Sequence, residues 1–389
     1  MKLYIRCVAL ICFLLSGCSA ASPASNVNPA PAIQPTASHA QEAGKIWRMV
    51  GYFPSWAPST RMYMPADIPA DLLTHLNYAF VVPDGQGLCV PDNELTADDN
   101  IAGLKMLKQV RPALQMLISI GGGGDLEKQF KKVVESPEAM AQFTTSCLDL
   151  MKRWGFDGLD MDWEFTQPEY KEPFTALMSE MRRQIDEQGR KDGRTYLLTM
   201  AAPAGPWGMA RLELDKIQPL VDWINLMTYD YYGSWSTVTG FLAPLYTSPG
   251  DPQGLSVDKT VHAYLDAGVP PGKLVLGVPF YGAAWQGVGQ ANNGLFQPNG
   301  GIFNQGAMDY REIAANYAGS FTLYRQEKSL APWLYDSQQG VMITYDDPQS
   351  LKEKTAYAQK LSLGGMMIWQ LAGDDLNNSL LKSLIVSSQ

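Results

Sequence analysis

Four acidic residues are clustered in one short segment of the chain. Asp157, Asp160, Asp162 and Glu164 all lie within residues 155–165 (GFDGLDMDWEF). If this segment is a β-strand, its side chains alternate between two faces, so the last three acids lie in a row on one face. Carboxylates this close raise one another's pKa, which is typical of sites that need acids with separated pKa values. We therefore predict an acid–base site here.

The opposite face of the same segment is apolar. Leu159, Met161, Trp163 and Phe165 fall on it and are expected to pack against a layer of helices. A buried parallel strand is normally apolar throughout, so three carboxylates on one such strand indicate function. A solvated edge strand with one polar face is the alternative, but Gly158 and the aromatic flanks favour a tightly packed strand.

The globular sequence alternates strand-like and helix-like segments, which predicts a parallel α/β fold. Helical patterns at 139–154 and 174–188 separate some of the strands. Eight repeats favour a (β/α)8 barrel, whose functional residues gather at the C-terminal ends of its strands. A doubly wound open sheet is the alternative, but the glycines at 121–124 lack the spacing of a dinucleotide-binding turn. The expected strands are 48–53, 76–82, 114–120, 158–164, 197–202, 223–228, 274–279 and 365–369.

The acidic segment, with its spacing Asp-x-x-Asp-x-Asp-x-Glu, resembles the signature of glycoside hydrolase family 18, the chitinases and their relatives. Residues 119–122 (SIGG) resemble the family's Ser-x-Gly-Gly motif, whose glycines let the backbone approach the catalytic strand closely. Five further segments resemble the family's first, second, sixth, seventh and eighth strands: 50–53, 77–80, 227–230, 278–282 and 364–369.

This resemblance covers the chain from about residue 46 and implies a (β/α)8 TIM barrel. It also implies a small α+β insertion at about 283–341, between strand 7 and helix 7, that walls one side of the cleft. A long irregular loop is the alternative, and such a loop is unusual at this length in a compact domain.

The resemblance also implies a substrate-assisted, retaining mechanism. Glu164 would protonate the leaving oxygen while the substrate's own 2-acetamido carbonyl attacks the anomeric carbon. Asp162 would hydrogen-bond Glu164 and then the acetamido N–H, and Asp160 would hold the proton that lets two acids stand so close. Tyr229 would donate a hydrogen bond to the acetamido oxygen, and Trp369 would form the floor under the sugar. The other lining residues implied are Tyr52, Phe80, Met227, Asp230 and Tyr281, of which the apolar ones could instead be barrel core.

Two positions depart from the family's pattern. Many members have Trp after Ser-x-Gly-Gly, where this chain has Gly123, and Arg two residues after the seventh-strand Tyr, where it has Ala283. Both losses concern substrate binding and leave the acids intact. Five other tryptophans could form further sugar subsites or simply pack: Trp56, Trp207, Trp235, Trp285 and Trp333.

The function expected from these features is hydrolysis of β-1,4-linked N-acetylglucosamine in chitin or chito-oligosaccharides. Two other enzymes remain open on the same fold, one acting on peptidoglycan and one on N-linked glycans. A non-catalytic glycan-binding lectin is the alternative from a different class, but it would be expected to lack the acid, and Glu164 is present.

The N-terminal segment is expected to be an export signal. A positive start and a short apolar run precede residues 15–18 (LSGC), which resemble a bacterial lipoprotein cleavage box. We expect a signal peptide at 1–18, a lipid on Cys18, an Ala/Pro/Ser-rich tether at 19–45 and the catalytic domain at 46–389. The protein would then be anchored at the cell surface, in the outer membrane if the source is a diderm bacterium. An ordinary signal peptide with a chance cysteine is the alternative.

Composition narrows the remaining classes of function. The formal net charge of -9 argues against nucleic acid as a partner. The three histidines are scattered, so we expect no metal site, no Ser-His-Asp triad and no cofactor. His75 lies in an apolar run and is expected to be a hydrogen-bonded core residue. Cys89 and Cys147 could pair or stay free, and a monomer is expected.

Overall fold

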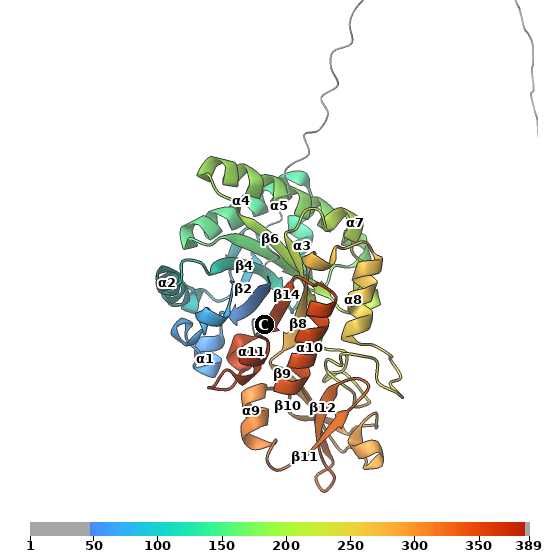
Figure 1. Ribbon diagram of the computed structural model, residues 1–389. Coiled ribbons are helices and arrows are strands. Elements are labelled where there is room, and N and C mark those ends of the chain that lie inside the picture. Colours follow the sequence, from blue (N-terminus) through green and yellow to red (C-terminus); the bar gives the residue numbers. More distant parts are fainter. Residues whose placement is uncertain (1–46, 386–389) are drawn as a thin grey trace, which may run out of the picture. The chain divides into compact units, whose positions relative to one another are not determined.

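A closed parallel barrel forms the main body of the protein (Figure 1). The computed structural model describes residues 47–385. Strand β1 pairs in parallel with both β14 and β2, which closes the sheet and makes the open-sheet alternative wrong. The predicted strands agree with the observed ones to within a residue or two at either end. The barrel strands are β1 (Arg48–Pro54), β2 (His75–Pro83), β4 (Gln115–Gly122), β5 (Gly158–Trp163), β6 (Leu197–Pro203), β7 (Trp223–Met227), β8 (Leu274–Pro279) and β14 (Gly365–Trp369).

Helices cover the outside of the barrel (Figure 1). Their ends follow from local sequence: Ser136 accepts a hydrogen bond from the backbone N–H of Ala139 at the start of α4, and Gly155 ends that helix with a φ of 75°. The predicted helices at 139–154 and 174–188 are thus confirmed, each extending further. The helices are α1 (Ala57–Arg61), α2 (Glu94–Val110), α3 (Glu127–Val133), α4 (Pro137–Trp154), α5 (Lys171–Asp192), α6 (Pro206–Met209), α7 (Leu214–Ile217), α8 (Val257–Asp266), α9 (Tyr310–Asn316), α10 (Pro348–Lys360) and α11 (Ser379–Ser383).

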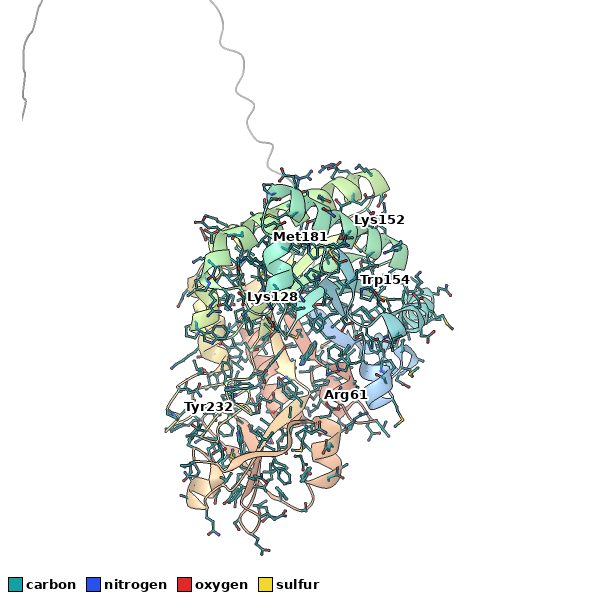
Figure 2. All side chains as sticks on the ribbon, turned by 180° about the vertical axis from the view of Figure 1, so that it is seen from behind. Arg61, Lys128, Lys152, Trp154, Met181 and Tyr232 are labelled. Atoms are coloured by element: carbon teal, nitrogen blue, oxygen red, sulfur yellow. A yellow bond between two sulfur atoms is a disulfide. The ribbon has the colours of Figure 1, made fainter. Side chains whose placement is uncertain are left out.

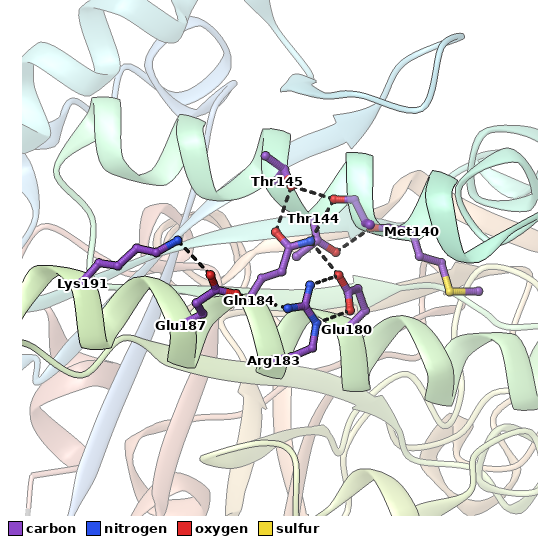
Figure 3. A network of polar contacts seen from close by, with 9 residues as sticks. Met140, Thr144, Thr145, Glu180, Arg183, Gln184, Glu187 and Lys191 are labelled. Carbon is purple, nitrogen blue, oxygen red and sulfur yellow. Dashed lines mark hydrogen bonds and ion pairs between the residues drawn. The ribbon is translucent and has the colours of Figure 1, made fainter.

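Polar side chains join α4 to α5 on the outer surface (Figure 3). Gln184 donates from Nε2 to the carbonyl oxygen of Ala141 at 3.0 Å and accepts from Thr145 Oγ1 at 2.9 Å. Arg183 makes two hydrogen bonds of 2.7 Å to Glu180 on the same helix. Such exposed ion pairs are worth little to stability, which makes Arg183 a useful control for charged pairs elsewhere. Within residues 47–385, no helix combines the length and the apolar character needed to span a membrane.

The catalytic-motif strand β5 is fully buried between β4 and β6. Leu159, Met161 and Trp163 belong to the apolar layer under the helices, and Trp163 stacks on Phe130 with ring centroids 4.4 Å apart. The edge-strand alternative is therefore wrong. The prediction for Phe165 is also wrong, because the strand ends at Trp163 and the alternation ends with it. Phe165 instead lines the cavity described in the next section.

The predicted insertion is a five-stranded antiparallel sheet with one helix, α9, beside it (Figure 1). It begins and ends a few residues outside the expected range of 283–341, and the irregular-loop alternative is wrong. Trp285 and Trp333 are buried in its core, and Ala283 pairs with Ala307 and Thr344 inside the sheet. Its strands are β9 (Tyr281–Gln286), β10 (Gly301–Asp309), β11 (Thr322–Gln326), β12 (Ala331–Asp336) and β13 (Val341–Thr344).

The fold answers one question that the sequence left open and confirms one expectation. Cys89, at the start of the short strand β3 (Cys89–Pro91), forms a disulfide with Cys147 on α4, with a Cα–Cα distance of 5.0 Å. His75 is buried, is 2.7 Å from Thr74 Oγ1 through its Nδ1, and packs edge-on against Trp223. It is therefore the hydrogen-bonded core residue that was expected. Cys18 and the tether at 19–45 lie outside the described residues.

Candidate active site

A cavity of about 620 Å³ opens at the C-terminal ends of the barrel strands. Glu164 follows the last residue of β5, and Trp369 is the last residue of β14. Two predicted site residues, Asp160 and Tyr281, do not line the cavity. Asp160 contacts the lining residue Tyr52, and Tyr281 contacts the lining residue Asp230. The predicted residues that line the cavity are Tyr52, Phe80, Asp162, Glu164, Met227, Tyr229, Asp230 and Trp369.

Asp160 lies at the bottom of the site with both carboxylate oxygens hydrogen-bonded. Oδ2 accepts from Tyr52 Oη at 2.6 Å and Ser119 Oγ at 2.9 Å. Oδ1 accepts from Thr199 Oγ1 at 2.5 Å and Asn225 Nδ2 at 3.1 Å. Burial raises the pKa of Asp160, and the hydrogen bonds oppose that rise. This set of donors stabilises the ionised carboxylate.

Asp162 lies two residues further along the strand and lacks the four donors that surround Asp160. It is buried, and its Oδ1 contacts no hydrogen-bond donor among residues 47–385. Burial, the charge of Glu164 and the charge of Asp160 together hold the pKa of Asp162 well above its ordinary value. Asp162 therefore holds its proton more tightly than an exposed aspartic acid does, and its Oδ1 is free to bind a ligand.

Glu164 reaches the cavity from the end of the same strand. Burial, together with the nearby charge of Asp230, raises its pKa to about 7. A carboxylic acid with this pKa can both give and take a proton near neutral pH. Asp230 is itself fixed by Tyr281, whose Oη donates to Oδ1 of Asp230 at 2.6 Å.

Tyr229 presents a neutral hydroxyl to the same cavity. Its pKa lies well above the ordinary value because the side chain is buried and several carboxylates surround it, Asp162 first among them. Its ring packs edge-on against Tyr281 at 6.2 Å. The phenol therefore stays protonated and can donate a hydrogen bond to a bound molecule.

The glycines at the end of β4 allow the close approach that the sequence predicts. Gly121 pairs with Asp162 across β4 and β5, and a Cβ added to Gly121 would lie 2.2 Å from the Asp162 carbonyl oxygen. A Cβ on Gly122 would lie 2.4 Å from the ring of Phe80. At Gly123 an added Cβ would meet only Glu164 Oε1 within 4 Å, at 3.8 Å, so the space beside the acid is open.

Aromatic side chains form the floor and the sides of the cavity. Trp369 stacks on Phe80 with ring centroids 5.6 Å apart, and Tyr52 meets it edge-on at 5.5 Å. Trp207 and Trp235 also line the cavity, with 52% and 63% of their surface exposed.

The structure thus separates the five uncertain tryptophans. Trp56, Trp207 and Trp235 line the cavity, whereas Trp285 and Trp333 do not.

Part of the cavity wall was missed by the sequence reading. Residues 283–341 contribute no lining side chain, so the expectation that the insertion walls the cleft directly is wrong for this cavity. The segment after β7 provides that wall through Tyr231, Gln253 and Leu255, together with Trp235, which the sequence had offered only as a possible subsite residue. The only sequence signal for it was its place after the C-terminal end of a barrel strand.

Comparisons with known proteins agree with this geometry. Residues 48–374 match the family model described as "Glycosyl hydrolases family 18". The chain is 35% identical to Chitinase A1 of Niallia circulans, over 90% of this chain and 59% of that protein. It is 32% identical to Chitinase B of Serratia marcescens, over 81% of this chain and 76% of that protein. The chain thus spans less than two thirds of the length of Chitinase A1.

Solved structures give the same result. A family 18 N-acetylglucosaminidase from Paenibacillus barengoltzii superposes with a TM-score of 0.78 at 32% identity, covering 87% of this chain and 99% of that one. An immunomodulatory active chitinase from Trichuris suis superposes with a TM-score of 0.82 at 26% identity, covering 87% and 98%. On the family match and these identities, the chain belongs to glycosyl hydrolases family 18 and carries its chitinase-type domain.

Proposed function

We propose that the protein hydrolyses β-1,4-linked N-acetylglucosamine in chitin or chito-oligosaccharides with retention of configuration. The observation that carries this proposal is the pair at the end of β5. Glu164 has a pKa of about 7 and faces the cavity, and its neighbour Asp162 is buried with Oδ1 unpartnered among the described residues. One group suits proton transfer, and the other suits recognition of a polar substrate group.

In the proposed reaction Glu164 gives its proton to the glycosidic oxygen as the bond to the anomeric carbon breaks. The carbonyl oxygen of the substrate's own 2-acetamido group forms the new bond to that carbon. Asp162 accepts the acetamido N–H, and its own proton passes to Asp160 as positive charge develops on the acetamido group. Tyr229 donates to the acetamido oxygen. Water then attacks the bicyclic oxazolinium intermediate, and Glu164 takes the proton from that water.

The placement of the shared proton follows from the hydrogen bonds at the bottom of the site. Four donors already satisfy Asp160, so its ionised form is the stable one. The proton that lets these acids lie so close is then held by Asp162. Burial and the charges of Glu164 and Asp160 raise the pKa of Asp162. Here the proposal departs from the expectation that Asp160 holds this proton.

Glu164→Gln tests the enzymatic function. The amide keeps the shape of the side chain but cannot deliver a proton, and loss of a general acid typically costs about 100- to 10,000-fold in rate. Products from chitin oligomers, peptidoglycan and a high-mannose glycopeptide, incubated side by side, are identified by mass spectrometry for wild type and variant. A variant that keeps a third or more of the wild-type rate on an unactivated oligosaccharide would refute the role of Glu164.

A second substrate class is favoured by one observation. The space beside Glu164 at Gly123 is open, so the leaving-group sugar can carry a bulky substituent. Peptidoglycan has such a substituent, a lactyl-peptide, on the sugar next to N-acetylglucosamine. Reducing-end products from peptidoglycan in the same experiment would support this class, and products from chitin oligomers alone would exclude it.

We propose in addition that the protein acts as a monomer tethered to a membrane by a lipid on Cys18. The support is the cleavage-box sequence at 15–18 and the low-complexity stretch that follows it. Cys18→Ser should release the protein from the membrane fraction of cells that express the full chain. Unchanged partitioning into detergent would contradict the lipid.

A further inference from the structure

The insertion, defined here as residues 281–344, contacts two loops that carry cavity-lining tryptophans. We propose that it sets the affinity of the cleft for sugar units beyond the one over Trp369, by positioning Trp56 and Trp235 without touching the substrate. This inference rests on the proposed function. It answers a question raised by the cavity, namely why a large insertion is attached to a site whose lining includes none of its residues 283–341.

Trp235 is highly exposed, yet the turn that carries it is fixed from behind. Its ring lies over Gly233, where an added Cβ would be 2.4 Å from the indole. Ser236 closes the turn, since its backbone N–H donates to the Gly233 carbonyl oxygen at 2.9 Å and its Oγ accepts from the Gly233 N–H at 3.2 Å. Asn299 of the insertion donates from Nδ2 to the Ser236 carbonyl oxygen at 2.9 Å. Asn299 thus binds the backbone of the turn that carries Trp235 and is not among the residues that line the cavity. It therefore orients the indole indirectly.

Thr239 continues this contact along the same loop. It is fully buried, and its Oγ1 donates to the Gly294 carbonyl oxygen at 2.6 Å while accepting from the Gln297 N–H at 3.0 Å. Its backbone N–H donates to the Gln297 carbonyl oxygen at 2.9 Å. Val238 forms a bridge with Pro298. Residues 236–239 therefore run beside the insertion like an added strand, and they cannot move independently of it.

The loop that carries Trp56 is attached to the insertion by an ion pair. Trp56 precedes α1, and Arg61 at the end of α1 makes a two-pronged ion pair with Asp309 of β10, at 2.7 Å from Nε and 3.1 Å from Nη2. Arg311 also approaches the Arg61 carbonyl oxygen at 3.4 Å. Both side chains of the pair are largely buried, so the geometry is of the kind in which a bidentate pair fixes position.

The two attachment points lie apart. In Figure 2, Arg61 and Tyr232 (next to the Trp235 turn) are on opposite sides of the molecule, with the insertion below them. Asn299 and Asp309 both belong to the insertion, so the insertion contacts both loops. A change in either contact should shift one tryptophan relative to Trp369, with Asp162 on β5 and Glu164 directly after it left in place.

Asn299→Asp tests the Trp235 side. The carboxylate keeps an acceptor for the Gly301 N–H, which Asn299 Oδ1 binds at 3.0 Å, but it cannot donate to Ser236. The matched control is Asn304→Asp in the same insertion, because Asn304 Nδ2 donates to Tyr317 Oη, away from either loop. Arg61→Met tests the Trp56 side, with Arg183→Met on the exposed α5 pair as its control (Figure 3).

The expected result separates binding from chemistry. Each test variant should raise KM for chito-hexaose about three- to tenfold, the scale of one misplaced aromatic contact, with kcat within about twofold. KM for a chromogenic substrate with a single sugar should not change, and neither control should alter any of these values. Amide hydrogen exchange should quicken at residues 236–239 in Asn299→Asp.

Two outcomes would overturn the inference. One is unchanged hexaose KM and unchanged exchange in both test variants. The other is an equal fall in kcat on every substrate, which would indicate general structural damage. Failure of the proposed function would look different, because wild type would then cleave no chito-oligosaccharide while exchange at residues 236–239 still responded to Asn299→Asp.

Discussion

Gly121 and Asp162 face each other on neighbouring parallel strands, so closely that a single added carbon on Gly121 would lie 2.2 Å from the Asp162 carbonyl oxygen. The φ of Gly121 is +118°, which side chains other than hydrogen rarely allow. The glycines of the Ser-x-Gly-Gly motif thus determine how the backbone under the acids is placed, although they carry no chemistry themselves.

Gly121→Ala should therefore damage both stability and activity. The strained φ and the clash with backbone together are expected to cost about 2–5 kcal/mol of unfolding free energy. Gly123→Ala is the matched control, because its new Cβ would meet only Glu164 Oε1, at 3.8 Å, within 4 Å. Thermal melts and rates of both variants check this, and equal effects at the two positions would contradict the role given to Gly121.

The raised pKa of Glu164 predicts how stability depends on pH. The carboxyl titrates near its ordinary 4.5 in the unfolded chain and at about 7 in the folded protein. The unfolded chain therefore loses this proton first, so the free energy of unfolding falls as the pH rises from about 4.5 to about 7.

Glu164→Gln removes that titration. The variant should match wild type in stability near pH 4 and exceed it at pH 8 by up to about 3 kcal/mol, at about 1.4 kcal/mol per pKa unit. Loss of the Glu164 charge also lowers the pKa of Asp162, which acts in the same direction. Unfolding curves across this pH range measure the difference, and a difference that does not change with pH would show that Glu164 titrates normally.

The row of acids could be predicted from sequence because a strand's alternation is local. Asp160 and Asp162 on β5 needed only the two-residue period to be placed together, whereas the role of the glycines at 121–122 came from their resemblance to the Ser-x-Gly-Gly motif. The barrel followed from repeated strand and helix patterns, whose spacing survives in a single sequence. Where the alternation ended, at Trp163, the prediction for Phe165 failed.

Contacts between distant segments could not be predicted in this way. Tyr52 and Asp160 are 108 residues apart, and nothing local indicates that their side chains meet at 2.6 Å. The same holds for Arg61 and Asp309, 248 residues apart. The family resemblance placed Tyr52 in the site, but it did not show that the insertion acts from behind the cavity wall.

The disulfide between Cys89 and Cys147 gives a further prediction. It closes a loop with a sequence separation of 58 residues, for which the chain-entropy relation gives about 4 kcal/mol at 25 °C. Reduction under native conditions should lower the melting temperature. The double variant Cys89→Ala/Cys147→Ala should behave like the reduced protein and be insensitive to reductant. Thiol titration shows whether the disulfide has been reduced. If the reduced wild type melts at the same temperature as the oxidised protein, the disulfide does not stabilise the fold.

Asp162→Asn tests whether the substrate itself supplies the nucleophile. The amide fills the same space but cannot become negatively charged as the acetamido group acquires positive charge. We expect kcat to fall about 100- to 1,000-fold, the usual effect of losing one charge-stabilising group, although Glu164 is intact. Tyr229→Phe should act in the same direction, because its ring keeps the packing against Tyr281 while the hydroxyl is lost.

The substrate offers the decisive control for these variants. An oligomer with glucosamine over Trp369 lacks the acetyl group, so wild type should not cleave it. On this oligomer Asp162→Asn should therefore differ little from wild type in rate. A thiazoline that mimics the bicyclic intermediate should bind wild type far more tightly than the parent sugar does, and Asp162→Asn should lose most of that difference. Efficient cleavage of the deacetylated oligomer, or a glycosyl–protein ester trapped on a carboxylate, would instead mean that a side chain of the protein is the nucleophile. Asp162, the acid of β5 nearest in sequence to Glu164, would then be the first candidate.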